Sequence, residues 1–134
     1  MSVIPGSRDI KVYRGEYSFA VDGGAIGAIP LRASQGSQGP IPAGSIILEA
    51  FLDVTTLFTT GTAATLALSV EGANDLVSAT VVSGAPYSTT GLKATLPVFT
   101  AASMIKTTAE RSPTGTIAVG TITAGVLALI IFYV

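Results

Sequence analysis

The sequence predicts an all-β protein, an antiparallel β-sandwich of jelly-roll-like form with about seven to nine strands. Two observations predict this class. Apolar runs of strand length are separated by turns rich in glycine, proline and asparagine along most of the chain. Residues 64–71 also alternate strictly, with Leu66, Leu68 and Val70 on one face of the expected strand. This spacing favours two packed antiparallel sheets over alternating strands and helices.

The chain divides into an extended N-terminal arm, residues 1–16, and a single sandwich domain, residues 17–134. Pro5 and Gly6 interrupt any regular element in the arm. Strands are expected at residues 17–22, 25–31, 45–56, 64–71, 76–83, 104–108, 114–119 and 124–134, with loops at 32–44 and 84–91 and a last hairpin at 121–125. Glu49 and Asp53 lie four residues apart, so a helix is the alternative for 45–56. The last strand is apolar on both faces and should lie in the centre of a sheet.

The composition indicates a protein that works in an assembly. Hydrophobic residues make up 49% of the chain and charged residues only 11%, against about 25% in an ordinary soluble domain. Much apolar surface must therefore be covered by the core or by neighbouring subunits. The seven basic residues are scattered and the formal net charge is −1, so no nucleic-acid partner is expected. The chain has no cysteine, which excludes disulfides.

Neither end of the sequence predicts a membrane or export segment. Residues 124–134 are apolar, but the run is too short for a membrane-spanning helix, which needs about 20 residues. Its β-branched and aromatic residues favour a buried strand, so no membrane partner is expected. The N-terminal residues contain no continuous apolar run of the kind found in secretory signals.

The residue types exclude the commonest forms of catalysis. Because the chain lacks histidine and cysteine, it has neither the usual general base nor a thiol nucleophile. Glu49 with Asp53, and Glu71 with Asp75, are the candidate carboxylate pairs for glycoside hydrolysis. In a strand, residues four apart lie more than ~13 Å from each other, too far for that reaction. The prediction is a non-enzymatic protein without a cofactor.

The turn at residues 71–75 has two interpretations. Its carboxylate and amide oxygens around Gly72 could form a weak calcium site, although the spacing of an EF-hand loop is missing. The favoured interpretation is that Asn74 and Asp75 bond the local backbone or accept a left-handed conformation. Gly23, Gly24 and Gly27 do not follow the order of a phosphate-binding loop, so they are interpreted as turn glycines.

Four segments resemble small structural proteins of tailed bacteriophages, of the capsid decoration or cement type. They are IPAG at 41–44 leading into LDVTT at 52–56, LSVEGANDL at 68–76, IKTTAER at 105–111, and ITAG at 122–125 before a strand that ends at Tyr133 and Val134. The resemblance extends from residue 41 to the last residue. It consists of turn and strand patterns and contains no chemical signature. It implies a β-sandwich on the outer surface of the capsid that forms an oligomer at a symmetry or quasi-symmetry axis.

The resemblance implies two partners, the major capsid protein and copies of the chain itself, with a trimer favoured over a dimer. The protein would be made in the host cytoplasm and located on the outer surface of the virion. Its contacts are expected in the arm and in the loop at 32–44, since extended segments add strands or apolar contacts to neighbours. The residues proposed for these contacts are Ile10, Val12, Tyr13, Arg14, Gln35, Gln38 and Ile41.

Other structural roles remain as alternatives. A fibre or spike domain would bind a host receptor such as a surface glycan, with the Gly/Ser/Thr-rich segment 83–91 as its binding surface. A tail or neck component would share the fold and assemble as a closed ring. A carbohydrate-active enzyme ranks below these, because of the carboxylate spacing.

Overall fold

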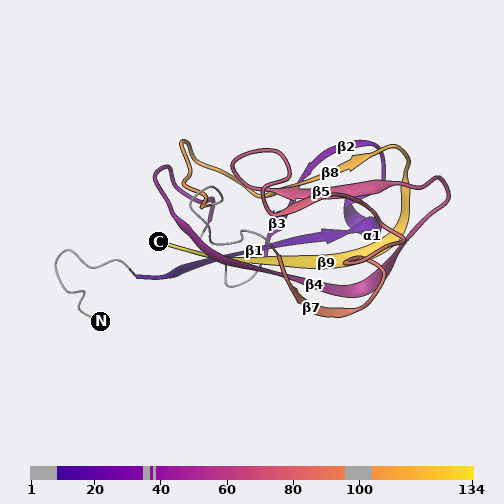
Figure 1. The fold of residues 1–134 in the computed structure, drawn as a ribbon, viewed down its shortest axis with the longest axis horizontal. Coiled ribbons are helices and arrows are strands. Elements are labelled where there is room, and N and C mark those ends of the chain that lie inside the picture. Colours follow the sequence, from indigo (N-terminus) through magenta and orange to yellow (C-terminus); the bar gives the residue numbers. More distant parts are fainter. Residues whose placement is uncertain (1–8, 35–36, 38, 96–103) are drawn as a thin grey trace.

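The computed structural model describes residues 9–34, 37, 39–95 and 104–134, and these form nine β-strands and one helical turn (Figure 1). The elements are β1 (Lys11–Ser18), α1 (Phe19–Asp22), β2 (Gly27–Pro30), β3 (Arg32–Ala33), β4 (Ile47–Thr60), β5 (Thr65–Ser69), β6 (Val77–Val81), β7 (Gly91–Ala94), β8 (Thr114–Ala118) and β9 (Ile122–Tyr133).

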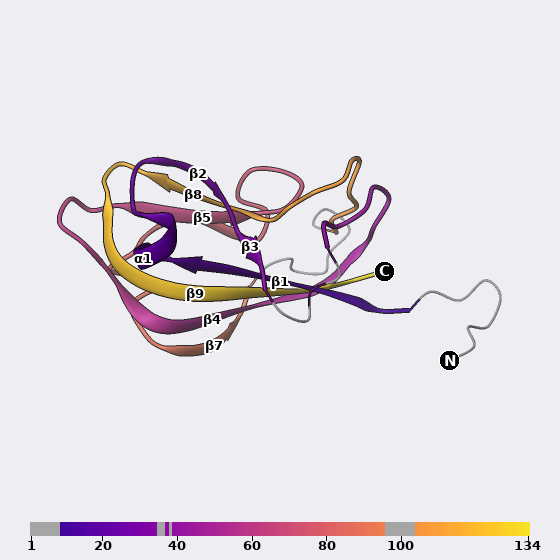
Figure 2. The same ribbon diagram turned by 180° about the vertical axis from the view of Figure 1, so that it is seen from behind.

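The strands form two antiparallel sheets packed face to face. Sheet A has the strand order β3-β1-β9-β4-β7, and sheet B has the order β2-β8-β5-β6. Both views of the ribbon show β5 and β8 of sheet B lying over β1, β9 and β4 of sheet A (Figures 1 and 2). The all-β sandwich predicted from the sequence is therefore confirmed.

Strand β9 lies in the centre of sheet A, as its apolar sequence predicts. It pairs with all eight residues of β1 on one side and with β4 on the other. Its inward side chains, Leu127, Leu129, Ile131 and Tyr133, are almost completely buried between the sheets. Burial of one such side chain contributes about 1.5–3 kcal/mol to stability. Through this pairing, the two longest strands, β4 and β9, and the first strand, β1, lie side by side in one sheet.

Three aromatic rings, those of Tyr17, Phe58 and Tyr87, pack together in the core near α1. Tyr17 stacks on Phe58 at a centroid distance of 5.7 Å, and Phe58 meets Tyr87 at 5.5 Å. The hydroxyl groups of the two tyrosines donate hydrogen bonds to the carbonyls of Gly23 and Leu66. Burial raises the pKa of Tyr17 to about 12, with a smaller contribution from the nearby charge of Asp22. The hydrogen bonds explain how polar rings can occupy the core without unpaired hydroxyls.

The expected arm at residues 1–16 differs from the structure in its second half. Residues 11–16 belong to β1, which pairs with β9 and β3, while residues 1–8 lie outside the described part of the chain. The charged residues of this segment suggested an arm, but Arg14 and Glu16 alternate with buried Tyr13, Gly15 and Tyr17. That alternation is the pattern of a strand with one buried face. The strand expected at 17–22 ends at Ser18, and α1 follows.

The secondary structure corrects the sequence-based expectations in several other places. Gly91 was expected to end a loop and residues 92–94 were assigned to no strand, but residues 91–94 form β7 and pair with residues 51–54 of β4. The helical alternative for 45–56 fails, because Ile47–Thr60 is a continuous strand. Residues 104–108 contribute a single bridge, Lys106 with Ile46, where a short strand was expected. The expected loop at 32–44 begins with β3.

The carboxylate of Asp75 stabilises the turn at residues 71–75. Asp75 accepts hydrogen bonds from the backbone N–H groups of Val70, Glu71 and Gly72 at 2.8–2.9 Å, and Asn74 has a φ of 62°. Both features confirm the interpretation of this segment as a turn. Glu71 points elsewhere and forms a bidentate pair with Arg111, at 2.8 and 3.1 Å. The pair ties the β5–β6 turn to the segment that precedes β8.

Glu71 should make stability depend on pH in the acid range. Hydrogen bonds from Arg111, and then from the N–H and hydroxyl of Thr108, lower the pKa of Glu71 from 4.5 to about 2. A lowered folded-state pKa gives stability that is present above pH 4.5 and is lost as the pH falls toward 2. Urea unfolding of the wild type and Glu71→Gln should therefore differ at pH 7 and converge near pH 2. A difference that stays constant over this range would contradict the assignment.

Candidate functional site

The described residues do not include a catalytic or metal-binding cluster. Among them, no group of three or more Asp and Glu side chains is placed to hold a metal ion. In the two candidate acid pairs, Glu71 binds Arg111 and Asp75 binds the turn backbone, while Glu49 and Asp53 are spaced along one strand. In this part of the chain, no helix is long and apolar enough to cross a membrane. The most informative feature is an exposed sheet face.

The outer face of sheet A, the side turned away from sheet B, carries an apolar patch. Side chains alternate between the two faces of a strand, so the neighbours of the core residues point outward. Five half-buried side chains define the patch, which we call the outer-face patch: Val12 of β1, Phe51 of β4, and Val126, Ile130 and Phe132 of β9. Val12, Phe51, Ile130 and Phe132 lie in two neighbouring rows of the register, and Val126 is separated from them by Ala128, which Glu16 and Asp53 flank.

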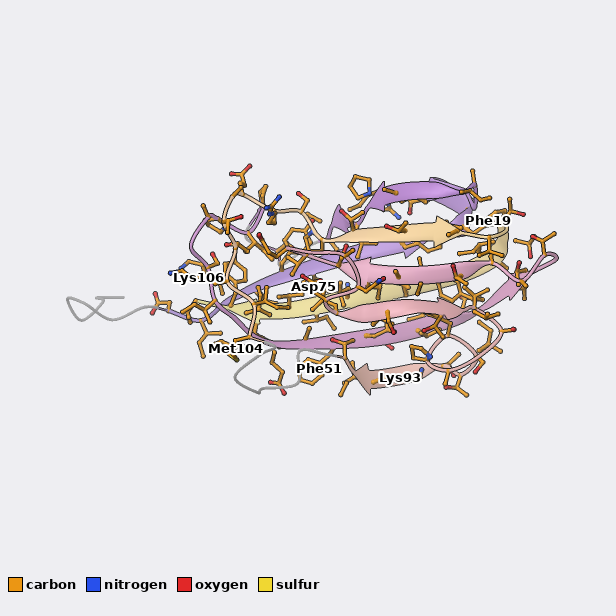
Figure 3. All side chains as sticks on the ribbon, turned by 45° about the horizontal axis from the view of Figure 1, so that its top comes forward. Phe19, Phe51, Asp75, Lys93, Met104 and Lys106 are labelled. Atoms are coloured by element: carbon orange, nitrogen blue, oxygen red, sulfur yellow. The ribbon has the colours of Figure 1, made fainter. Side chains whose placement is uncertain are left out.

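Phe51 and Phe132 form the aromatic centre of the outer-face patch. Their rings meet edge to face, with centroids 6.0 Å apart and an interplanar angle of 80°. Val12 lies opposite Phe132 in the register of β1 and β9, and Ile130 lies opposite Phe51. Figure 3 shows Phe51 on β4, beside β7. Such rigid aromatic groups are the side chains that most often anchor protein interfaces.

A shallow hollow extends the patch toward the first described residues. It has a volume of about 310 Å³ and is lined by Ile10, Leu48, Glu49 and Phe132. Ile10 is 65% exposed, although it is a large aliphatic residue. At the other side of the sheet, Leu92 of β7 is equally exposed. The apolar surface therefore runs from the start of β1 to the edge strand β7.

Charged side chains surround the outer-face patch. Arg14 and Glu16 lie on β1 and form an exposed ion pair at 2.8 Å, which contributes little to stability. Glu49 and Asp53 lie on β4, on the opposite side of β9. An apolar centre with a polar and charged rim is the usual organisation of a protein–protein interface. The geometry of this surface is therefore suited to binding a partner protein.

The structure places some of the predicted contact residues on or beside this surface and others in the core. Ile10, Val12 and Arg14 lie on or beside the outer-face patch. Tyr13 and Ile41 belong to the core, 3% and 0% exposed, so their side chains are not available to a partner. The hydroxyl of Tyr13 donates to the carbonyl of Leu31 at 2.9 Å. Gln35 and Gln38 lie outside the described residues.

Sequence reasoning did not find the aromatic centre of the patch. The strand expected at 124–134 is apolar on both faces, and this pattern indicated burial. Sheet B covers one face of β9 only, so Ile130 and Phe132 on the other face stay partly exposed. The available signal was the low charge of the whole chain, which indicates that some apolar surface is covered by other subunits.

Solved structures with this fold come from bacteriophage capsids. One is a chain of the capsid of Ralstonia phage GP4, with a TM-score of 0.63 and 26% identity over 100% of this chain and 90% of that chain. A second comes from the capsid of cyanophage Pam1, with a TM-score of 0.62, 20% identity, and 99% and 91% coverage. A third comes from the acid-stable capsid of Helicobacter pylori bacteriophage KHP30, with a TM-score of 0.61, 10% identity, and 92% and 86% coverage.

These similarities extend over nearly the whole of each chain, so they concern the entire domain. No family model and no curated protein matches the sequence. The chain therefore has a phage-capsid-related β-sandwich fold.

Proposed function

We propose that the chain is a capsid decoration protein, which binds the outer surface of a bacteriophage head and stabilises the shell. The observation that supports this most is the fold shared with chains of three phage capsids over at least 86% of their length. The absence of histidine and cysteine agrees with a structural role, since the usual catalytic bases and nucleophiles are missing. The direct partner is the major capsid protein, and the protein is a virion component made in the host cytoplasm.

The outer-face patch is the surface that contacts the shell. It combines the Phe51–Phe132 pair with a rim of both charge signs, so it can exclude water at its centre and align the partner at its edge. The sandwich beneath it is rigid, because β1, β9 and β4 are paired along their length. Binding at several equivalent positions adds avidity to contacts that are modest one at a time.

The N-terminal residues extend this contact. The first described residues lead directly into β1, and exposed Ile10 lines the hollow beside Phe132. Residues 1–9 of the bound protein contact the capsid subunits in this proposal, by strand addition or apolar contact. Removal of these nine residues leaves β1 complete, since the strand begins at Lys11. We expect this deletion to weaken binding to the shell without unfolding the sandwich.

The proposal is tested by binding to shells. Heads of the phage that encodes this chain are prepared without it, the purified protein is added, and bound protein is measured by co-sedimentation. Saturable binding with a fixed ratio to the major capsid protein is expected, together with a higher temperature of shell disruption. Absence of binding to intact heads would contradict the proposal. Retention on host cells instead would favour a receptor-binding fibre or spike.

A further inference from the structure

A second apolar surface lies at the end of the sandwich formed by α1 and the β8–β9 turn. Its members are Phe19, Val21, Ile26 and Val119, which are 37%, 68%, 61% and 72% exposed. We call it the α1 patch. Phe19 lies at the end of the molecule opposite to Met104 and Lys106 (Figure 3). The α1 patch is therefore remote from the hollow at Ile10, which lies before the other end of β1.

The backbone brings the members of the α1 patch together. Gly24 accepts a hydrogen bond from the N–H of Ile122 at 2.9 Å, and Gly27 pairs with Ile117. The segments 24–27 and 117–122 thus run side by side, with Ile26 on one and Val119 on the other. Helical turn α1 directly precedes the first segment and lies against β9 (Figure 2). The four exposed side chains consequently belong to one region of the surface.

Val119 lies in the short connection between β8 and β9. Val119 has a φ of 70°, and Gly120 donates its N–H to the carbonyl of Ala118 at 2.8 Å, which forms a γ-turn. A β-branched residue at positive φ is strained. The strained turn presents an apolar side chain to solvent, and such outliers are found most often at functional sites.

The charges around the α1 patch favour a contact between identical surfaces. The one charged residue between positions 17 and 31 is Asp22, and Arg32 binds its carboxylate at 3.0 and 3.1 Å. Residues 54–63 and 112–134 contain no charged side chain. A surface that meets a copy of itself would repel if it carried a net charge. The outer-face patch, by contrast, is surrounded by Arg14, Glu16, Glu49 and Asp53.

We propose that the α1 patch is the contact through which copies of this chain associate with one another. The inference rests on the proposed function and specifies its self-association surface. Strand β1 has eight residues and spans about 26 Å. An oligomer joined at its α1 ends holds the Ile10 ends away from its centre, where each can reach a different capsid subunit. The arrangement supplies the multivalency that shell binding needs.

Self-association is measured on the full chain by light scattering coupled to size exclusion, over a wide range of protein concentration. The wild type is expected to form a discrete oligomer. Val21→Asp and Val119→Asp introduce a charge at the contact and should lower the association constant at least about tenfold. Val21→Asp leaves the β8–β9 turn unchanged, since Val21 lies in α1. The control is Met104→Asp, at a 50% exposed methionine that lies at the end of the molecule opposite to Phe19 (Figure 3), and it should associate like the wild type.

Circular dichroism of each variant shows that the sandwich is folded. A wild type that is monomeric at all concentrations would overturn the inference, and so would variants that keep the wild-type oligomer. Shell binding is measured in parallel, so that the two proposals fail separately. If the protein is a monomer that still binds shells, only the proposed α1 contact is contradicted. If it is an oligomer that does not bind shells, only the proposed decoration role is contradicted.

Discussion

Replacement of Phe132 by serine is expected to weaken binding to the phage shell about 30-fold, a loss of about 2 kcal/mol, which is typical of an aromatic anchor. Phe132 forms the centre of the outer-face patch with Phe51 and also lines the hollow beside Ile10. Serine removes the ring, so Phe51 loses its aromatic partner and the hollow beside Ile10 loses part of its apolar lining. Co-sedimentation with shells at increasing protein concentration measures the change in affinity.

The control for this variant is Val81→Ser, which removes an exposed apolar side chain from sheet B, outside the outer-face patch. It should bind shells like the wild type. Phe132→Ser should retain the oligomer and the β-sheet circular dichroism spectrum, since Phe132 lies outside the core. Unchanged shell binding by a folded Phe132→Ser protein would show that the outer-face patch is not the contact surface.

Replacement of Gly125 by alanine is expected to reduce the free energy of unfolding by about 3 kcal/mol or more. Gly125 has a φ of 145°, which L-residues rarely adopt, and a Cβ atom there would lie 2.4 Å from the ring of Phe58. Phe58 cannot move away, because it packs between Tyr17 and Tyr87. Urea unfolding measures the change.

Gly115→Ala is the matched control within the same core. A Cβ atom at Gly115 would lie 3.4 Å from Leu66 and 3.7 Å from Leu31 and Leu68, at ordinary van der Waals distances. Gly115 lies in β8, where alanine restricts the unfolded chain more than glycine does. Stability is expected to stay equal or to rise by about 0.5–1 kcal/mol. Equal free energies of unfolding for Gly125→Ala and Gly115→Ala would contradict the close packing of Phe58 against Gly125 of β9.

Most of the sandwich follows from local patterns in the sequence. The alternation of residues 64–71, the turn at 72–75 and the doubly apolar last strand correspond to β5, the Asp75 turn and central β9. The elements that could not be predicted depend on partners far away in the sequence. Strand β7 has four residues and exists because β4 offers a free edge. Residues 11–16 look like an arm until pairing with β9 makes them a strand.

The contact surface was only partly predictable, for a reason of geometry. Ile10, Val12 and Arg14 were proposed together with Tyr13, but neighbouring residues of a strand point to opposite faces. Once residues 11–18 form β1, Tyr13 must enter the core when Val12 and Arg14 face outward. Ile41 is likewise drawn into the core by its bridge to Arg111. Phe51 and Phe132 become neighbours only through the register of β4 and β9.

The low charge of the chain has a structural explanation in these two surfaces. The outer-face patch and the α1 patch place aromatic and aliphatic side chains on the surface in groups. Groups of this kind are uncommon on a protein that works as a free monomer. An assembly that covers both would leave little apolar surface exposed, so the composition and the two proposed contacts agree.

The central claim is that the protein decorates the outer shell through sheet A, and cryo-electron microscopy of particles from the phage that encodes it tests this most directly. The account predicts regularly placed density on the outside of the head, with Phe51 and Phe132 against the major capsid protein and the α1 ends of neighbouring copies in contact. Density confined to the tail, neck or fibres, or a sheet A face turned to solvent, would contradict it.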